Sequence, residues 1–129
     1  MREADAREYA AIFCGGFVGA IARIALVQTL PGGNATWPWA TFSANMAGAF
    51  LLGYFTTRLQ ERLPVSSYWR PLLGTGFCGA FTTFSTWMLE SHHLGEDGRT
   101  VLMAANLLLC LVLGPLACAV GRFAGGALW

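Results

Sequence analysis

Apolar residues gather into four long runs, and almost all charged residues fall between or outside them. The runs cover Tyr9–Leu30, Pro38–Thr57, Pro71–Leu89 and Thr100–Val120. A helix needs about 20 apolar residues to cross a bilayer, so each run has the length of one crossing. The first run contains one charge, Arg23, and the others contain none. We therefore expect an all-α membrane protein with four transmembrane helices, in which residues 1–129 form a single integral membrane domain.

The arginines are distributed unevenly over the segments outside these runs. With four crossings, the N-terminus, the loop "RLQERLPVSSYWR" and the C-terminus lie on one side of the membrane. Positive residues favour the cytoplasmic side, so both ends are expected in the cytoplasm of a multi-pass protein of the cell (inner) membrane. The other side carries Arg99, together with Arg23 if that side chain snorkels. The arginines of the first side are Arg2, Arg7, Arg58, Arg62, Arg70 and Arg122.

Composition supports the membrane interpretation and excludes some partners. The chain is 55% hydrophobic and 12% charged, whereas soluble domains have about 25% charged residues. The net charge of +1 argues against nucleic acid, which calls for a clustered basic face. The four cysteines all fall inside the apolar runs, without the spacing of a metal site, and are expected to pack as small apolar residues.

The third run contains the least lipid-like stretch of the chain, "GTGFCGAFTTFSTW" at residues 74–87. Glycine weakens a helix by about 1 kcal/mol relative to alanine, and threonine favours a helix N-terminus. The glycines followed by Thr82 and Thr83 predict two half-helices that meet near Gly79–Thr82. Unwound backbone at that depth must be buried in protein or line a wet cavity. It exposes carbonyls that can bind a cation, and a helix N-terminus whose dipole favours an anion.

Side chains that follow the predicted interruption suit a small anion. Phe84 and Trp87 are three residues apart and share a helix face, and the edges of aromatic rings carry partial positive charge. Ser85 and Thr86 add hydroxyl donors, and the stretch contains no basic residue. Such donors would hold an anion weakly enough for release, which conduction requires.

Three polar residues in the other runs each leave two interpretations open. Arg23 either binds carbonyls near a vestibule or contacts a ligand, because a charge within a crossing faces protein or water. Asn45 either forms a hydrogen bond between helices or directs its amide toward an anion. Asn106 begins a stripe with Cys110, Gly114 and Cys118, which either packs against a neighbouring helix or lines a pathway.

Four segments together resemble the fluoride channel family called Fluc or CrcB. They are "GGFVGAIAR", "ATFSANMAGAFLLG", "GTGFCGAFTTFSTW" and "NLLLCLVLG", one in each run, so the resemblance covers nearly the whole chain. It implies a dual-topology dimer of antiparallel four-helix subunits with a broken third helix. Two fluoride pathways would run along the subunit interface, and a structural Na⁺ would sit at the centre of the dimer.

The resemblance also implies roles for individual residues. The backbone carbonyls of Gly79 and Thr82 would hold the Na⁺, and Arg23 matches the arginine of the family's first helix. Two positions depart from the family pattern: Trp87 stands where a second Phe is usual, and Cys110 where Ser is common. Trp87 keeps a positive ring edge and adds an N–H donor. The expected fluoride pathway comprises Asn45, Thr83, Phe84, Ser85, Thr86, Trp87 and Asn106.

The implied function is passive export of F⁻ from the cytoplasm, which lowers fluoride toxicity and involves no enzyme activity. The chain would pair with itself as an antiparallel homodimer, or with a paralogue as a heterodimer, since its arginines favour one orientation. Three alternatives remain open. A small multidrug-type four-helix exporter needs a carboxylate inside a run, and none occurs. A non-conducting partner subunit is the second, and a metal enzyme using Glu90, His92 and His93 is the third.

Overall fold

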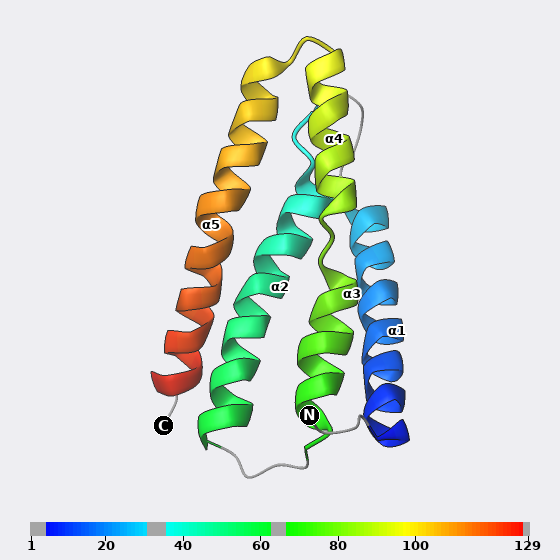
Figure 1. Cartoon of the computed structure of the whole chain (residues 1–129). Coiled ribbons are helices and arrows are strands. Elements are labelled where there is room, and N and C mark those ends of the chain that lie inside the picture. Colours follow the sequence, from blue (N-terminus) through cyan, green and yellow to red (C-terminus); the bar gives the residue numbers. More distant parts are fainter. Residues whose placement is uncertain (1–4, 31–35, 63–66, 128–129) are drawn as a thin grey trace.

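The computed structural model describes residues 5–30, 36–62 and 67–127, and all secondary structure in these ranges is helical. The helices form four rods that run alternately up and down (Figure 1). The prediction of an all-helical, four-rod protein is therefore confirmed for the described residues. The first rod is α1 (Ala6–Thr29), the second is α2 (Trp39–Thr57) with η1 (Arg58–Arg62), the third is η2 (Pro71–Cys78), α3 (Gly79–Phe81) and α4 (Ser85–Glu96), and the fourth is α5 (Thr100–Ala127).

Within the described residues, α1 and α5 are the two helices long and apolar enough to cross a membrane. Their large apolar side chains, among them Phe13, Phe17, Leu108 and Phe123, are exposed on the surface of the chain. Exposed apolar side chains of this number are unusual in water and are natural against lipid. The crossings by the second and third rods stay predictions. Polar residues lower the hydropathy of α2, and the third rod is divided into helices each too short to cross alone.

The rods pack in two close pairs, α2 with α5 and α1 with η2 (Figure 1). Glycines make the close approach possible on both sides. A Cβ on Gly15 would meet the carbonyl oxygen of Leu72, and a Cβ on Gly53 would meet that of Cys118. Small residues at helix crossings let backbones approach closely in lipid, so packing against backbone replaces the hydrophobic effect as the source of cohesion.

Gly121 provides a test of this packing. Its Cβ would meet the Phe50 carbonyl, whereas a Cβ on Gly114 would lie 3.9 Å from the end of the Met46 side chain. We expect Gly121→Ala to lower the free energy of unfolding by about 1–3 kcal/mol, because the helices must separate. Gly114→Ala gains helix propensity without this cost. Thermal unfolding in detergent compares the two variants; equal melting temperatures would contradict the assigned crossing.

The third rod departs from regular α-helix in two places, its first part and the residues that precede α4. Its first part, η2, is a π-helix that begins at Pro71, and Gly79 keeps ordinary helical dihedral angles (φ −62°, ψ −39°). The helical backbone ends at Phe81 and resumes at Ser85. The glycines thus accompany a widened helix, and the non-helical residues are Thr82, Thr83 and Phe84, at the C-terminal edge of the region expected from the sequence.

Candidate ion pathway

Asn45 of α2 satisfies the backbone of the third rod where it leaves the helix. Thr82 is extended (φ −82°, ψ 159°), so the following peptide groups lose their helical partners. The Asn45 Oδ1 atom accepts a hydrogen bond of 2.8 Å from the Thr83 backbone N–H. The Asn45 Nδ2 group donates one of 3.0 Å to the Thr83 carbonyl. Of the two interpretations for Asn45, a hydrogen bond to a neighbouring rod describes these contacts, and one of the two Nδ2 hydrogens is not used in them.

Gly48, one turn along α2, lets the same segment approach. A Cβ on Gly48 would meet the Thr82 Cγ2 atom. Thr82 is also held by the preceding helical turn, because its N–H (3.1 Å) and its hydroxyl (2.9 Å) both donate to the Cys78 carbonyl. The interruption therefore has a defined geometry, set by α2 on one side and by the end of α3 on the other.

Two carbonyls at the interruption have lost the donors that a continuous helix would provide. In an α-helix the N–H of each residue bonds to the carbonyl four residues earlier. The Thr83 N–H, which would serve Gly79, donates to Asn45 instead. The Thr86 N–H, which would serve Thr82, donates at 3.3 Å to the Thr83 hydroxyl. The carbonyls of Gly79 and Thr82 therefore do not accept the bonds that residues 83 and 86 would give in a continuous helix.

The hydroxyl groups after the interruption form one cluster. The Thr83 hydroxyl donates to Thr86 Oγ1 (3.2 Å) and lies 3.4 Å from Ser85 Oγ. The Thr83 hydroxyl also accepts the Thr86 N–H in the first turn of α4. Ser85 is exposed, and Thr83 and Thr86 are half-buried. The structure therefore brings together the three hydroxyls that the sequence suggested.

Phe84 and Trp87 form an aromatic pair beside this cluster. Their ring centroids are 5.5 Å apart and their planes meet at 73°, the edge-to-face arrangement that rings prefer. Phe84 is 70% exposed in the single chain, whereas Trp87 is 8% exposed. The Trp87 indole N–H donates at 3.4 Å to the Asn106 carbonyl of α5. The additional donor expected from Trp87 is therefore committed to a helix within the subunit.

Asn106 lies inside the subunit, between α4 and α5. Its side chain is fully buried, donates at 3.0 Å to the Ser91 hydroxyl and accepts at 3.6 Å from the Cys110 thiol. Of the two interpretations for Asn106, packing against a neighbouring helix describes the contacts of this chain. Ser91 did not stand out in the sequence, and its spacing of four residues from Trp87 was the one available signal.

A second polar pair lies one turn beyond the aromatic pair. The Thr41 hydroxyl donates at 2.9 Å to the Glu90 carboxyl, and the other Glu90 oxygen is buried without a hydrogen-bond partner among the described residues. Glu90 follows the predicted third crossing directly. Burial raises the pKa of the Glu90 carboxyl, while the Thr41 hydrogen bond and the nearby His93 lower it. Thr41 and Asn45 are four residues apart, so α2 directs both side chains toward the third rod.

The remaining predicted groups lie elsewhere. Arg23 is half-buried on α1, whose last turns lie at the level of the interruption (Figure 1). Among the described residues, no three His, Cys, Asp or Glu side chains are placed to hold a metal ion. His92 instead lies 3.4 Å from Glu96, one turn along α4.

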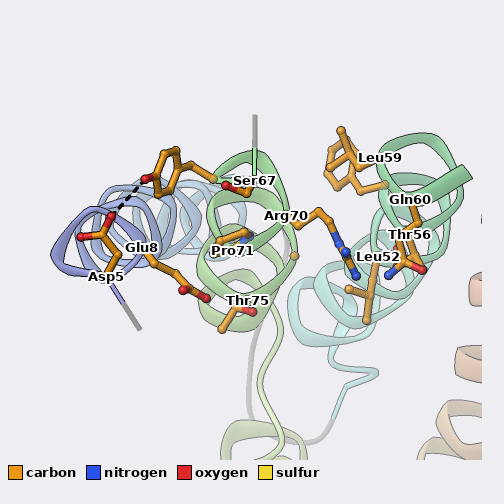
Figure 2. Close-up of a pocket in the computed structure, with 13 residues that line it drawn as sticks. Asp5, Glu8, Leu52, Thr56, Leu59, Gln60, Ser67, Arg70, Pro71 and Thr75 are labelled. Carbon is orange, nitrogen blue, oxygen red and sulfur yellow. Dashed lines mark hydrogen bonds between the residues drawn. The ribbon is translucent and has the colours of Figure 1, made fainter. Parts of the chain in front are cut away.

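An open pocket of about 900 Å³ lies at the other end of the third rod, where η2 begins. Figure 2 shows Asp5 and Glu8 on the α1 side of η2, and Arg70 extending toward α2. The Tyr68 hydroxyl donates at 3.1 Å to Asp5 and ties the start of α1 to this segment. The pocket contains none of the predicted pathway residues. Its lining is Asp5, Glu8, Leu52, Phe55, Thr56, Leu59, Gln60, Ser67, Tyr68, Arg70, Pro71, Gly74 and Thr75.

This arrangement can be compared with known families. The family model described as "CrcB-like protein, Camphor Resistance (CrcB)" matches residues 10–122, which include the interruption and most of all four rods. The chain belongs to the CrcB family. The resemblance read from the four sequence segments is thereby confirmed.

Relatives within the CrcB family match most of the chain. "Fluoride-specific ion channel FluC 1" of Mycolicibacterium paratuberculosis (strain ATCC BAA-968 / K-10) is 56% identical over 120 residues, covering 88% of this chain and 91% of the relative. The protein of that name in Mycobacterium tuberculosis (strain CDC 1551 / Oshkosh) is 56% identical over 113 residues, 88% of this chain and 86% of the relative. "Fluoride-specific ion channel FluC" of Koribacter versatilis (strain Ellin345) is 43% identical over 115 residues, 84% and 91% of the two chains. All three are named as ion channels, and none as an enzyme.

Proposed function

We propose that this chain is the subunit of a fluoride-selective passive channel that lets F⁻ leave the cytoplasm. The observation that carries the proposal is the interruption at Thr82, Thr83 and Phe84, in a chain 56% identical to fluoride-specific channels. Hydroxyl groups and aromatic ring edges lie together there, and Asn45 holds the Thr83 backbone by hydrogen bonds. The stretch from Pro71 to Leu89 contains no charged residue. The chemistry is that of donors that stabilise a small anion and release it.

The driving force needs no coupled reaction. Fluoride that enters as neutral HF ionises inside the cell, and an inside-negative potential favours exit by about 2.3 kcal/mol per charge per 100 mV. A narrow pore with few, fixed donors would exclude larger anions by size, because only the smallest halide fits it. The protein would therefore work in the cell (inner) membrane as a multi-pass channel. Its arginines favour the orientation with both ends in the cytoplasm, and an antiparallel partner would have the opposite orientation.

The exposure of the site argues for a second subunit. Phe84 and Gly79 are exposed in the single chain, although they adjoin the interrupted backbone in the middle of the third crossing. Backbone interrupted at this depth is stable only against protein or water. An antiparallel copy, with two half-helices meeting at each interruption, would cover these residues and form two fluoride pathways along the interface. The partner is a second copy of the chain or an oppositely oriented paralogue.

The carbonyls of Gly79 and Thr82 would hold a structural Na⁺ at the centre of that dimer. Both have lost their α-helical donors at the interruption, and carbonyl oxygens are suitable ligands for a hard cation. The ion would neutralise the carbonyl dipoles of two neighbouring subunits and so join them.

The test is fluoride efflux from liposomes that contain only this purified protein, followed with a fluoride electrode, with chloride as the control anion. We expect rapid fluoride efflux and no measurable chloride efflux, because the donors are sparse and fixed. This result would also establish the homodimer. A chain that carries neither ion alone, nor with a co-expressed paralogue, nor as Trp87→Phe, would contradict the proposed channel.

A further inference from the structure

Three buried side chains join α4 to α5 directly behind the aromatic pair. Trp87, Ser91 and Asn106 are 8%, 3% and 0% exposed. Asn106 Nδ2 donates to Ser91 Oγ (3.0 Å), and Ser91 Oγ donates to the Trp87 carbonyl (2.8 Å). The Trp87 indole N–H donates to the Asn106 carbonyl (3.4 Å). The bonds form a closed ring, which we call the Ser91 network, and each residue both donates and accepts.

The Ser91 network fixes how Trp87 faces Phe84. A buried indole N–H requires an acceptor, and the Asn106 carbonyl provides it on the α5 side. The indole therefore presents carbon-bound hydrogen to Phe84 and to an ion beside it, as a phenylalanine at position 87 would. If the indole turned, its N–H would enter the pathway as a stronger donor, which would hold an anion longer and discriminate less by size.

Ser91 is the member of the network on which the other two depend. It contacts Trp87 through the backbone and Asn106 through the side chain. Without its hydroxyl the fully buried Asn106 amide would have an unsatisfied donor, and buried unsatisfied groups are costly. We expect Asn106 to turn to relieve this cost, which would loosen the packing of α4 on α5 where the Asn106 carbonyl accepts the indole N–H.

We propose that Ser91 is a positioning residue, which keeps the Trp87 indole N–H turned toward α5 and thereby sets fluoride conduction and selectivity. This inference rests on the proposed channel function for its effect on flux, but its structural part can be measured independently. Without the Ser91 network, the indole N–H of Trp87 could face the pathway as a hydrogen-bond donor. With the network in place, the pathway meets only the edge of the indole ring.

Two readouts test the inference on the full chain. The first is the NMR signal of the Trp87 indole N–H in detergent micelles, identified by its absence in Trp87→Phe. We expect slow exchange with solvent in the native chain and at least about tenfold faster exchange in Ser91→Ala, because the network opens. The second is fluoride and chloride efflux from liposomes, where Ser91→Ala should lower fluoride flux about tenfold and reduce the preference for fluoride.

The controls separate positioning from general stability. Thr29→Ala removes an exposed hydroxyl that donates to a carbonyl of its own helix, and should leave both readouts unchanged. Ser91→Thr keeps the hydroxyl and should restore both. In the Trp87→Phe background Ser91→Ala should have little further effect on flux, because no indole N–H remains to be oriented. If Ser91→Ala does not insert or fold, Ser91→Cys, a weaker donor of similar size, replaces it.

Each outcome decides one of the two proposals. Unchanged indole exchange in Ser91→Ala would overturn the positioning role, and so would equal losses of flux with Trp87 and with Trp87→Phe. If the native chain carried no fluoride under any condition, the channel proposal would fail, and indole exchange alone would decide whether Ser91 orients Trp87.

Discussion

Replacing Phe84 with isoleucine is expected to abolish fluoride flux, by at least about a hundredfold, while the subunit remains folded. The expected loss follows from ring chemistry: isoleucine is apolar but lacks the positive ring edge that faces an anion. A loss of this size corresponds to about 2.7 kcal/mol in the barrier to conduction. The fold should be little affected, because Phe84 is 70% exposed and makes its ring contact with Trp87.

The measurement is efflux from liposomes with a fluoride electrode, together with the elution volume of the purified variant on size exclusion. Phe13→Ile is the matched control, because Phe13 is 74% exposed on α1 and is expected to face lipid. It should conduct normally. Undiminished flux in Phe84→Ile would refute the role assigned to this ring, whereas aggregation of Phe84→Ile alone would show that the ring is needed for assembly.

Asn45→Leu is expected to remove both conduction and much of the stability. Leucine has a similar volume but cannot bond to Thr83, so a backbone N–H and a carbonyl at the interruption lose their partners. Each unsatisfied buried group costs about 1–3 kcal/mol. We expect a clear fall in melting temperature in detergent and loss of fluoride flux, since Thr83 also positions the hydroxyl cluster.

Gln28→Leu is the control for Asn45→Leu, because it removes an exposed side-chain amide near the end of α1. Its melting temperature and flux should stay close to those of the native chain. If Asn45→Leu lost flux with an unchanged melting temperature, Asn45 would act mainly on the ion. If it kept both, the clamp on Thr83 would be unimportant.

The sequence was informative where a feature depends on neighbours along the chain. Helix length follows from runs of apolar residues, so the four rods were predictable, and the Thr-rich stretch after Gly79 pointed to the residues where the helix is interrupted. The alternatives for Asn45 differed only in its partner, which lies 38 residues away at Thr83. Membrane crossing by the second and third rods remains a prediction from composition.

Other parts of the site depend on the rotation of one helix against another, which periodicity does not determine. Trp87 was expected to add an N–H donor, but the packing of α4 on α5 directs that donor to the Asn106 carbonyl. The same packing buries Asn106 and brings Ser91 next to it, although nothing in the sequence around Ser91 indicated a role. The glycines were expected to break the helix, yet Gly74 and Gly76 lie within the π-helix η2, and Gly76 packs closely against α1.

The Asn45 clamp on Thr83 also bears on the order of assembly. Because the peptide groups of Thr83 are satisfied by an asparagine of the same chain, a newly inserted subunit does not need a companion to complete this part of its backbone. In the proposed antiparallel dimer, two chains that enter the bilayer in opposite directions would then associate after each has folded. Dimerisation would require contact between folded surfaces and not joint folding. Folded subunits would diffuse in the membrane and exchange dimer partners. The numbers of chains inserted in each orientation would therefore determine how many pores form.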